Sequence, residues 1–352
     1  MDNFMPPREV ADICPAPERA AETVNCTRRT KKLSNVICFS LLLQQPIALI
    51  GGIILIVLYY FINIVILRNN ISMDAIKSLA DSSTLAGEIY SSIIYFSYMF
   101  IPFILMVFIF KQNPFRIVPV KGIKNKAMIL PALALVFGFY FLADLATQYI
   151  QVFLGFVNLQ ATSPDFTPPT GIPAFAVYFF QICIMAPLCE EFIFRGVILH
   201  NLKPLGNAFA VLVSALLFSM VHGDLLQMPL AFFVGLLFGV LVIKSGSIWL
   251  TVILHASVNT FSVIIDLFGS RLGGNTATLI YLGVVFIAIM ACVMVAVYLH
   301  VVRKVSFKEK FENFKKSVLP NQFLIKKFVL TPGFLIFSAL TLVYVIIYIK
   351  VV

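Results

Sequence analysis

The sequence predicts an all-α, polytopic transmembrane helical bundle. Of its 352 residues, 60% are hydrophobic and 12% are charged, and the mean hydropathy is +0.97. Soluble domains carry about 25% charged residues, so this composition excludes an ordinary soluble globular protein. Apolar runs of about 18 residues or more, the length that a membrane-spanning helix needs, recur along nearly the whole chain. The runs are continuous rather than alternating, which argues against a transmembrane β-barrel.

Nine hydrophobic segments can be read along the chain. The first follows about 35 mostly polar residues that include six Lys or Arg. No signal-peptide layout of basic region, short apolar core and small-residue cleavage site follows them, so we expect the first segment to be a retained signal anchor. The nine segments lie at about 42–67, 89–110, 127–154, 172–194, 207–222, 228–243, 248–268, 277–302 and 332–349.

The basic residues predict an orientation, because Lys and Arg are retained on the cytoplasmic side during insertion. With the N-terminus inside, 22 of the 26 basic residues fall on the inner side and 4 on the outer side. We therefore expect an integral, multi-pass protein of the cell membrane with a cytoplasmic N-terminus, an outer loop at 155–173 and an outer C-terminus. We therefore interpret the net charge of +10 as a signal of membrane orientation. No separate basic domain indicates a nucleic-acid partner.

A basic stretch at 303–327 separates the last two segments. Apolar residues recur there at helical spacing among lysines, which predicts an amphipathic helix lying on the anionic inner leaflet of the lipid bilayer. The alternative is a solvated basic loop. The apolar residues are Phe307, Phe311, Phe314 and Val318.

Two adjacent carboxylates interrupt the fourth segment. Residues 172–189 hold no charged side chain, and Glu190, Glu191 and Arg195 follow them. Ionisable side chains cost about 2.5–3.5 kcal/mol at the centre of a membrane helix, so each is a candidate functional residue. Glu191 and Arg195 are one helical turn apart and can pair, whereas Glu190 points about 100° away from Glu191. A free carboxylate facing a cavity suits a general base acting on water. The alternative is a cytoplasmic turn with an ordinary helix salt bridge.

Polar residues on two later segments strengthen the catalytic interpretation. His222 ends the fifth segment, and His255 and Asn259 lie four residues apart on the seventh, hence on one helix face. A single histidine inside a membrane is more often a packed, hydrogen-bonded residue than a catalyst. Two histidines, an asparagine and a glutamate pair on neighbouring segments are harder to explain structurally. No comparable set of polar residues accompanies Asp144 or Asp266. We interpret both as structural, with Asp144 forming a helix–helix hydrogen bond.

These motifs resemble those of a known family. Glu190-Glu191-x-x-x-Arg195, Phe218-x-x-x-His222 and His255-x-x-x-Asn259 occur in this order on three separate segments. The pattern resembles the CAAX-protease and bacteriocin-processing family, also called the abortive-infection family, which includes the type II CAAX prenyl endopeptidases. Each motif alone is weak, but the ordered set makes a specific match over about residues 90–270.

The resemblance implies an intramembrane endopeptidase that acts on a membrane-associated or lipidated peptide or protein. By position, Glu190 and His222 would activate the attacking water, and His255 and Asn259 would bind the developing oxyanion. Glu191 and Arg195 would support the site.

The resemblance also implies a division of the chain. Residues 1–35 would form a cytoplasmic tail and 36–302 an eight-span protease core with its motifs within 190–259. Residues 303–330 would form the cytoplasmic basic segment and 331–352 an additional C-terminal span.

Four alternatives stay open at this point. Glu190, His222 and His255 could form a zinc set with water as the fourth ligand, but no HExxH motif is present, and we expect a reaction without a cofactor. Cys189 could suggest a thiol protease, although nothing marks it as a thiolate. A transporter would also hold buried ionisable residues, but it would usually show paired halves with broken helices. A non-catalytic immunity scaffold would not need the complete motif set.

Overall fold

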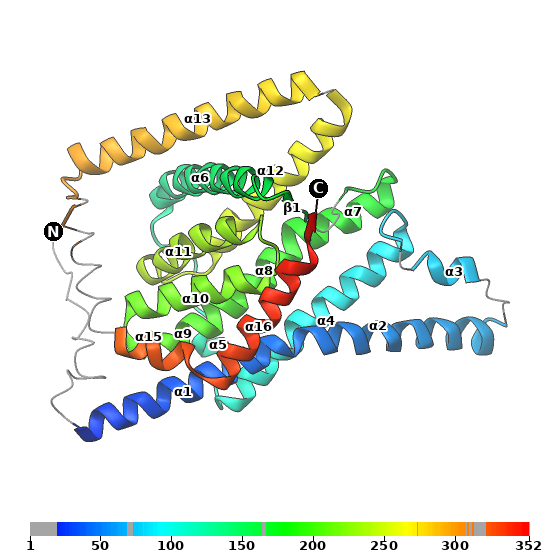
Figure 1. The fold of residues 1–352 in the computed structure, drawn as a ribbon, viewed down its shortest axis with the longest axis horizontal. Helices are drawn as coiled ribbons and strands as arrows, with labels where there is room; N and C mark the ends of the chain where they lie inside the picture. The colour runs from blue at the N-terminus through cyan, green and yellow to red at the C-terminus, as the bar shows by residue number, and fades with distance from the viewer. Residues whose placement is uncertain are drawn as a thin grey trace.

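The computed structural model is a helical bundle with one pair of short strands in the part of the chain that it describes (Figure 1). Seven described helices are long and apolar enough to cross a membrane, and a further pair of helices, bent by 66° at residues 330–331, is an eighth candidate. The predicted all-α polytopic bundle is thus confirmed. The described residues are 20–68, 73–79, 81–163, 167–272, 274–306, 308–309, 312 and 322–351.

Each of the nine predicted segments corresponds to a helix or to a chain of helical turns. The agreement is close: the segment predicted at 228–243 is the helix Met228–Ser245. The helices other than the fourth segment are α2 (Gln44–Phe61) with the π-helical turn η2 (Ile62–Ile66), α4 (Leu85–Ile109), α6 (Ile129–Gly155), α10 (Asn207–Val221), α11 (Met228–Ser245), α12 (Trp249–Leu272), α13 (Gly274–Val301) and α16 (Pro332–Ile347).

The fourth segment is a continuous helical path of 34 residues from Ile172 to Leu205. It continues past Glu190 and Glu191. The glutamates therefore lie within the helical path, where residues of the other two motifs can reach them. Two stretches of it are π-helical. This form is rare in proteins, and where it occurs it often lies at a functional site. In order, the path consists of α7 (Ile172–Phe180), η4 (Gln181–Met185), α8 (Ala186–Glu191), η5 (Phe192–Ile198), α9 (Leu199–Leu202) and η6 (Lys203–Leu205).

Helices α10 and α11 pack closely because glycines of α11 face α10. A Cβ atom on Gly235 would lie 3.2 Å from the Cα of Ala215, and one on Gly239 would lie 3.1 Å from Val211. Small residues at such contacts let the backbones of membrane helices approach each other. Helix α10 has 15 residues, which at 1.5 Å per residue reach about 22 Å, less than the roughly 30 Å of a bilayer core. His222 therefore follows a helix too short to cross the bilayer alone.

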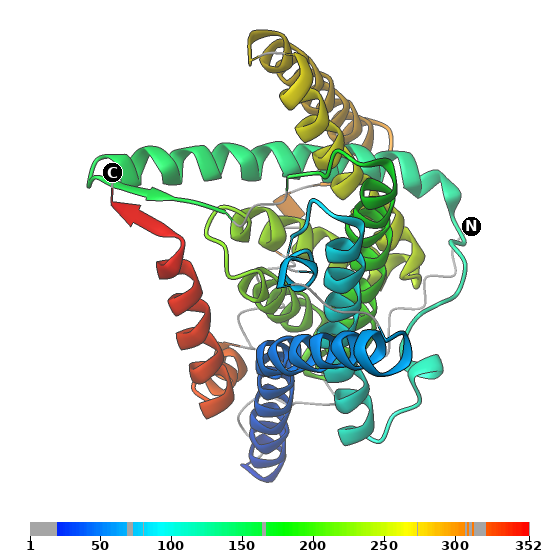
Figure 2. The same cartoon turned by 90° about the vertical axis from the view of Figure 1, so that its right-hand side faces the viewer.

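Helix α13 packs against α6 and lies at the outside of the bundle (Figure 2). Many of its apolar side chains are exposed. One polar contact joins these two helices within the apolar surroundings. The Tyr281 hydroxyl of α13 donates to Asp144 Oδ2 of α6 at 2.6 Å, and Gln148 donates to the same oxygen at 2.8 Å. The predicted helix–helix hydrogen bond of Asp144 is confirmed. Asp266 is exposed on α12.

The N-terminal region contains a helix where the sequence predicted a polar tail over 1–35. Helix α1 (Ala20–Leu42) packs against α16 and against α15 (Gln322–Val329). Ser34 of α1 donates to the Phe328 carbonyl at 2.8 Å, and Asn35 accepts from the Gly333 amide at 2.9 Å. The buried positions of α1 recur at helical spacing, but two of them are too small or polar to mark a hydrophobic stripe. They are Cys26, Thr30, Leu33, Ile37 and Leu41.

The C-terminal end of the described chain is fixed by a strand. Strand β2 (Ile349–Val351) pairs antiparallel with β1 (Leu159–Ala161), with Gln160 opposite Lys350, beside the end of α6 (Figure 2). The Thr162 amide also donates to the Tyr348 carbonyl at 2.7 Å. The loop after α6 and the end of α16 therefore lie on the same side of the bundle, as the predicted topology requires.

Three short elements complete the described chain: α3 (Met73–Lys77), α5 (Pro114–Ile117) and η3 (Lys126–Met128). The apolar positions predicted to form an amphipathic helix in 303–327 lie outside the described residues. At the end of that stretch, α15 is amphipathic, with Leu324 and Phe328 buried and Lys326 exposed.

Candidate active site

Helix α8 carries the two adjacent glutamates between the π-helical turns η4 and η5 (Figure 1). Both carboxylates are buried: Glu191 is 0% exposed and Glu190 is 9% exposed. Burying a carboxylate is unfavourable unless it is paired or hydrogen-bonded. The neighbours of each glutamate therefore indicate what it does.

Glu191 pairs with Arg195, as predicted from their spacing. The Nη1 atom of Arg195 lies 2.8 Å from Oε1 of Glu191. The Arg195 guanidinium also lies 4.3 Å from the centre of the Phe218 ring and 5.3 Å from that of Phe238, and cations are attracted to ring faces at such distances. The pair is thus enclosed by α10 and α11 and lies inside the protein rather than in a cytoplasmic turn.

His255 of α12 lies between the two glutamates. Its Nδ1 is 3.1 Å from Oε1 of Glu191, and its Nε2 is 3.7 Å from Oε2 of Glu190. The rings of Phe218 and Phe238 flank the imidazole, with centres at 5.9 and 5.7 Å. A carboxylate only accepts hydrogen bonds, so Nδ1 donates to Glu191. The ring is then fixed with Nε2 turned towards Glu190.

Glu190 has a partner that the sequence did not reveal. The hydroxyl of Tyr95, on α4, donates to Oε1 of Glu190 at 2.7 Å. The other oxygen, Oε2, is buried and has no hydrogen-bond partner. A buried carboxylate oxygen without a partner is costly in a stable core, and such atoms occur where a ligand or a reacting molecule binds. Glu190 therefore has one oxygen held in place and one available.

His222 caps the end of α10 and lies one ring away from this centre. Its Nδ1 contacts the carbonyl of Phe218 at 2.7 Å, and its ring meets the Phe218 ring edge-on at 4.9 Å. A carbonyl only accepts, so Nδ1 donates and Nε2 is left available. Among the described residues, no hydrogen bond or ion pair joins His222 to Glu190. Phe218, which also contacts His255, is the link between the two histidines.

Asn259 lies one turn after His255 on the same face of α12. Its Nδ2 donates to the carbonyl of Ile182 at 2.8 Å, within the π-helical turn η4. One of its two amide hydrogens is thus used to join α12 to the helix that carries the glutamates. The second is available to another acceptor.

The structure thus brings Glu190, Glu191, Arg195 and His255 together. It links His222 to His255 through the ring of Phe218 and places Asn259 one turn after His255 on α12. Two further residues were missed. Tyr95 lies in no motif and well before Glu190 in the sequence, and the one available signal is that a tyrosine hydroxyl in an apolar helix needs a partner. Asp224 follows His222 closely and is 1% exposed, with Oδ1 accepting from the Leu226 amide at 2.8 Å and Oδ2 unpartnered.

The side chains of the zinc and thiol alternatives lie in or beside this site. Within the described residues, no three His, Cys, Asp or Glu side chains are arranged to hold a metal ion. The set Glu190, His222 and His255 does not fit zinc as it stands, and we derive no step through a metal. Cys189 is a free, buried thiol, and no hydrogen bond to it is seen in the described chain.

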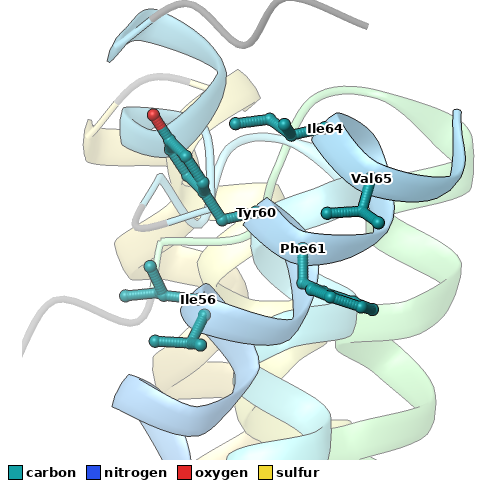
Figure 3. Close-up of a pocket in the computed structure, with 6 residues that line it drawn as sticks. Ile56, Tyr60, Phe61, Ile64 and Val65 are labelled. Atoms are coloured by element: carbon teal, nitrogen blue, oxygen red, sulfur yellow. The ribbon is translucent and has the colours of Figure 1, made fainter. Parts of the chain in front are cut away.

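An apolar groove lies on the surface of α2 and η2 (Figure 3). All of its lining side chains come from one helical stretch, and none belongs to the motifs. It offers no polar group for catalysis, and outward apolar faces of membrane helices normally contact lipid. The lining residues are Ile56, Val57, Tyr60, Phe61, Ile64 and Val65.

The segment that carries the site matches a known family. Residues 172–261 match the sequence model of the family described as type II CAAX prenyl endopeptidase Rce1-like. This range contains all three motifs of the candidate site. The match confirms the resemblance inferred from those motifs.

Three curated proteins are similar in sequence to part of the chain. Over 85 residues it is 38% identical to a Bacillus subtilis (strain 168) protein named "Putative membrane peptidase YdiL". The aligned residues make up 24% of this chain and 35% of that protein. Over 98 residues it is 30% identical to the membrane-embedded CAAX protease MroQ of Staphylococcus aureus (strain USA300), covering 26% and 40%. Over 130 residues it is 31% identical to an uncharacterized 24.3 kDa protein of Escherichia coli, covering 34% and 60%. The chain thus spans less than two thirds of each relative, and no solved structure matches it.

Proposed function

We propose that this protein, whose residues 172–261 resemble the type II CAAX prenyl endopeptidases, is an intramembrane endopeptidase. Its substrate is a membrane-associated or lipidated peptide or protein. The substrate class comes from the description of the family and from the names of two relatives, a putative membrane peptidase and a CAAX protease.

One observation carries the proposal: His255 lies between two buried glutamates that have different partners. Arg195 and His255 both contact Oε1 of Glu191. Each glutamate has an Oε2 without a hydrogen bond, but it is Oε2 of Glu190 that lies 3.7 Å from His255 Nε2. That separation is too long for a direct hydrogen bond. A water placed to one side can contact both atoms. A site that holds water between a carboxylate and an oriented imidazole suits hydrolysis.

In the proposed reaction, Glu190 is the general base. The water gives a proton to Oε2 as its oxygen bonds to the carbonyl carbon of the substrate. The same proton then passes to the amine that leaves as the peptide bond breaks, so Glu190 returns to its starting state. Glu191 and Arg195 keep the His255 ring oriented throughout, as a buried carboxylate does in other hydrolases.

His255 and His222 exchange roles relative to the sequence-based assignment. The sequence suggested His222 as the partner of Glu190, but the imidazole beside Glu190 is that of His255. We therefore propose His255 as the residue that orients the water. We retain Asn259, whose second amide hydrogen is available, as a contributor to oxyanion binding, and we propose that His222 takes the oxyanion role that the resemblance implied for His255.

The experiment uses the purified full-length protein in lipid nanodiscs. Fluorogenic peptides that contain a cysteine, with and without a prenyl group on it, are offered to the wild type and to Glu190→Gln. We expect the wild type to cleave at least one peptide. The variant should lose about 10²–10⁴-fold in kcat, the usual contribution of a positioned general base.

A matched control changes a carboxylate outside the site. Asp266→Asn alters an exposed residue of α12 and should leave cleavage unchanged. Equal activity of the wild type and Glu190→Gln would remove Glu190 as the base. Loss of cleavage with a chelator, restored by zinc, would instead favour the metal-dependent peptidase.

A further inference from the structure

Tyr95 reaches the candidate site from outside the segment that the family model matches. It lies on α4, outside the family-matched range 172–261. Its hydroxyl is the only hydrogen-bond donor to the Glu190 carboxylate in the described part of the chain, at 2.7 Å from Oε1. The contact joins residues 95 positions apart, so only the packing of α4 against α8 creates it.

The face of α4 that carries Tyr95 is fixed at a second point. Ser92, three residues earlier and on the same helix face, donates to Oε1 of Gln181 at 2.6 Å. Gln181 begins the π-helical turn η4, immediately before α8, and is 8% exposed. Two polar contacts therefore hold α4 against the helical path that carries Glu190. The Tyr95 hydroxyl has a stable position from which to act.

The hydrogen bond divides the work between the two oxygens of Glu190. Oε1 is occupied by Tyr95, and Oε2 is buried, unpartnered and nearest to His255. The His255 contact, at 3.7 Å, is too long to hold the carboxylate. Without the tyrosine hydroxyl, no hydrogen bond from the described residues would hold the carboxylate against rotation about its last bond. Either oxygen could then face the reacting water, or neither.

We propose that Tyr95 is a positioning residue of the peptidase: it holds Oε1 of Glu190 so that Oε2 faces His255 and the attacking water. This role rests on the proposed function. It acts through Glu190, since the hydroxyl donates to Oε1 of Glu190 and, within the described chain, forms no hydrogen bond to His255. A misdirected base slows the chemical step without weakening substrate binding.

The test compares two tyrosines one turn apart on α4. Tyr95→Phe removes the hydroxyl that binds Glu190 and keeps the ring. Tyr98→Phe removes the hydroxyl of the neighbouring tyrosine, whose ring packs edge-on against Tyr95 at 5.2 Å and which forms no hydrogen bond within the described chain. Both are measured as full-length protein in nanodiscs with the peptide that the wild type cleaves best.

We expect Tyr95→Phe to lower kcat by about 10- to 100-fold with KM nearly unchanged, as for a lost hydrogen bond to a charged group. Tyr98→Phe should match the wild type in kcat and KM. Tyr95→Phe leaves Oε1 of Glu190 without its hydrogen bond and should unfold at a somewhat lower temperature, but it should remain folded at the assay temperature. In a Glu190→Gln background, Tyr95→Phe should cause no further loss, because the group that it positions is already inactive.

Each other outcome overturns the role in a recognisable way. A wild-type rate in Tyr95→Phe, or an equal loss in Tyr98→Phe, rejects Tyr95 while leaving the peptidase intact. A Tyr95→Phe protein that unfolds where Tyr98→Phe is stable shows that the hydroxyl supports the fold instead. A wild type that cleaves no peptide rejects the proposed function, and the role of Tyr95 fails with it.

Discussion

The Nδ1 atom of His255 lies 3.1 Å from Oε1 of Glu191, and this contact joins helices that are 64 residues apart in sequence. The same carboxylate oxygen accepts from Arg195 at 2.8 Å. A buried arginine, a carboxylate and an imidazole thus form one connected unit. Changes to any of the three should affect both the stability of the bundle and the orientation of His255.

Replacing Arg195 with methionine should strongly destabilise the protein. Arg195 is 2% exposed and Glu191 is 0% exposed, so the substitution leaves a buried carboxylate without its counter-charge. Breaking a buried pair in this way typically costs about 3–5 kcal/mol. The free energy of unfolding, measured by denaturing detergent titration of the purified protein, checks this.

An exposed ion pair of the same chain provides the control. Lys77 and Asp74 lie 3.5 Å apart with side chains 74% and 89% exposed, and such pairs add little stability. Lys77→Met should therefore leave the unfolding free energy nearly unchanged. Equal effects of the two substitutions would contradict the burial of Arg195.

Replacing His255 with asparagine should cost more activity than any other histidine substitution. Its imidazole is the one nearest Glu190 Oε2, so we expect kcat to fall by about 10²–10⁴-fold. His222→Asn should cause a smaller loss, since His222 reaches the centre only through Phe218. His200, exposed on α9, is the control, and His200→Asn should cleave at the wild-type rate. A larger loss for His222 than for His255 would restore the sequence-based roles.

The sequence predicted the helices well because the hydrophobic length of a membrane helix is set by the bilayer. It also predicted the Glu191–Arg195 pair, because residues four apart on a helix meet whatever the tertiary structure. It could not show which histidine lies beside Glu190, since that depends on how α10 and α12 cross α8. It missed Tyr95 because a hydroxyl carries no charge that would mark it. It missed α1 because the buried side of that helix uses residues such as Cys26 and Thr30.

The pairing of β1 with β2 should be detectable by cross-linking. Gln160 and Lys350 are opposite each other, and directly paired residues lie about 4.5–5.5 Å apart between Cα atoms, within reach of a disulfide. In a background without the native cysteines, Gln160→Cys with Lys350→Cys should form a disulfide under mild oxidation. Leu159→Cys with Ile349→Cys is the control, since these residues are out of register and too distant. Efficient cross-linking of the control pair alone would contradict the observed register.

The same cysteines test the orientation that the basic residues predict. The β1–β2 pairing requires the loop after α6 and the end of α16 to share one side of the membrane. The distribution of Lys and Arg predicts that this side is the outer one. A membrane-impermeant thiol reagent should therefore label single cysteines at Gln160 and Lys350 in intact cells. A cysteine at Lys124, in the loop before α6, should react only after permeabilisation. The opposite labelling pattern would invert the topology while preserving the fold, because strand pairing fixes which segments lie together but not which side faces the cytoplasm.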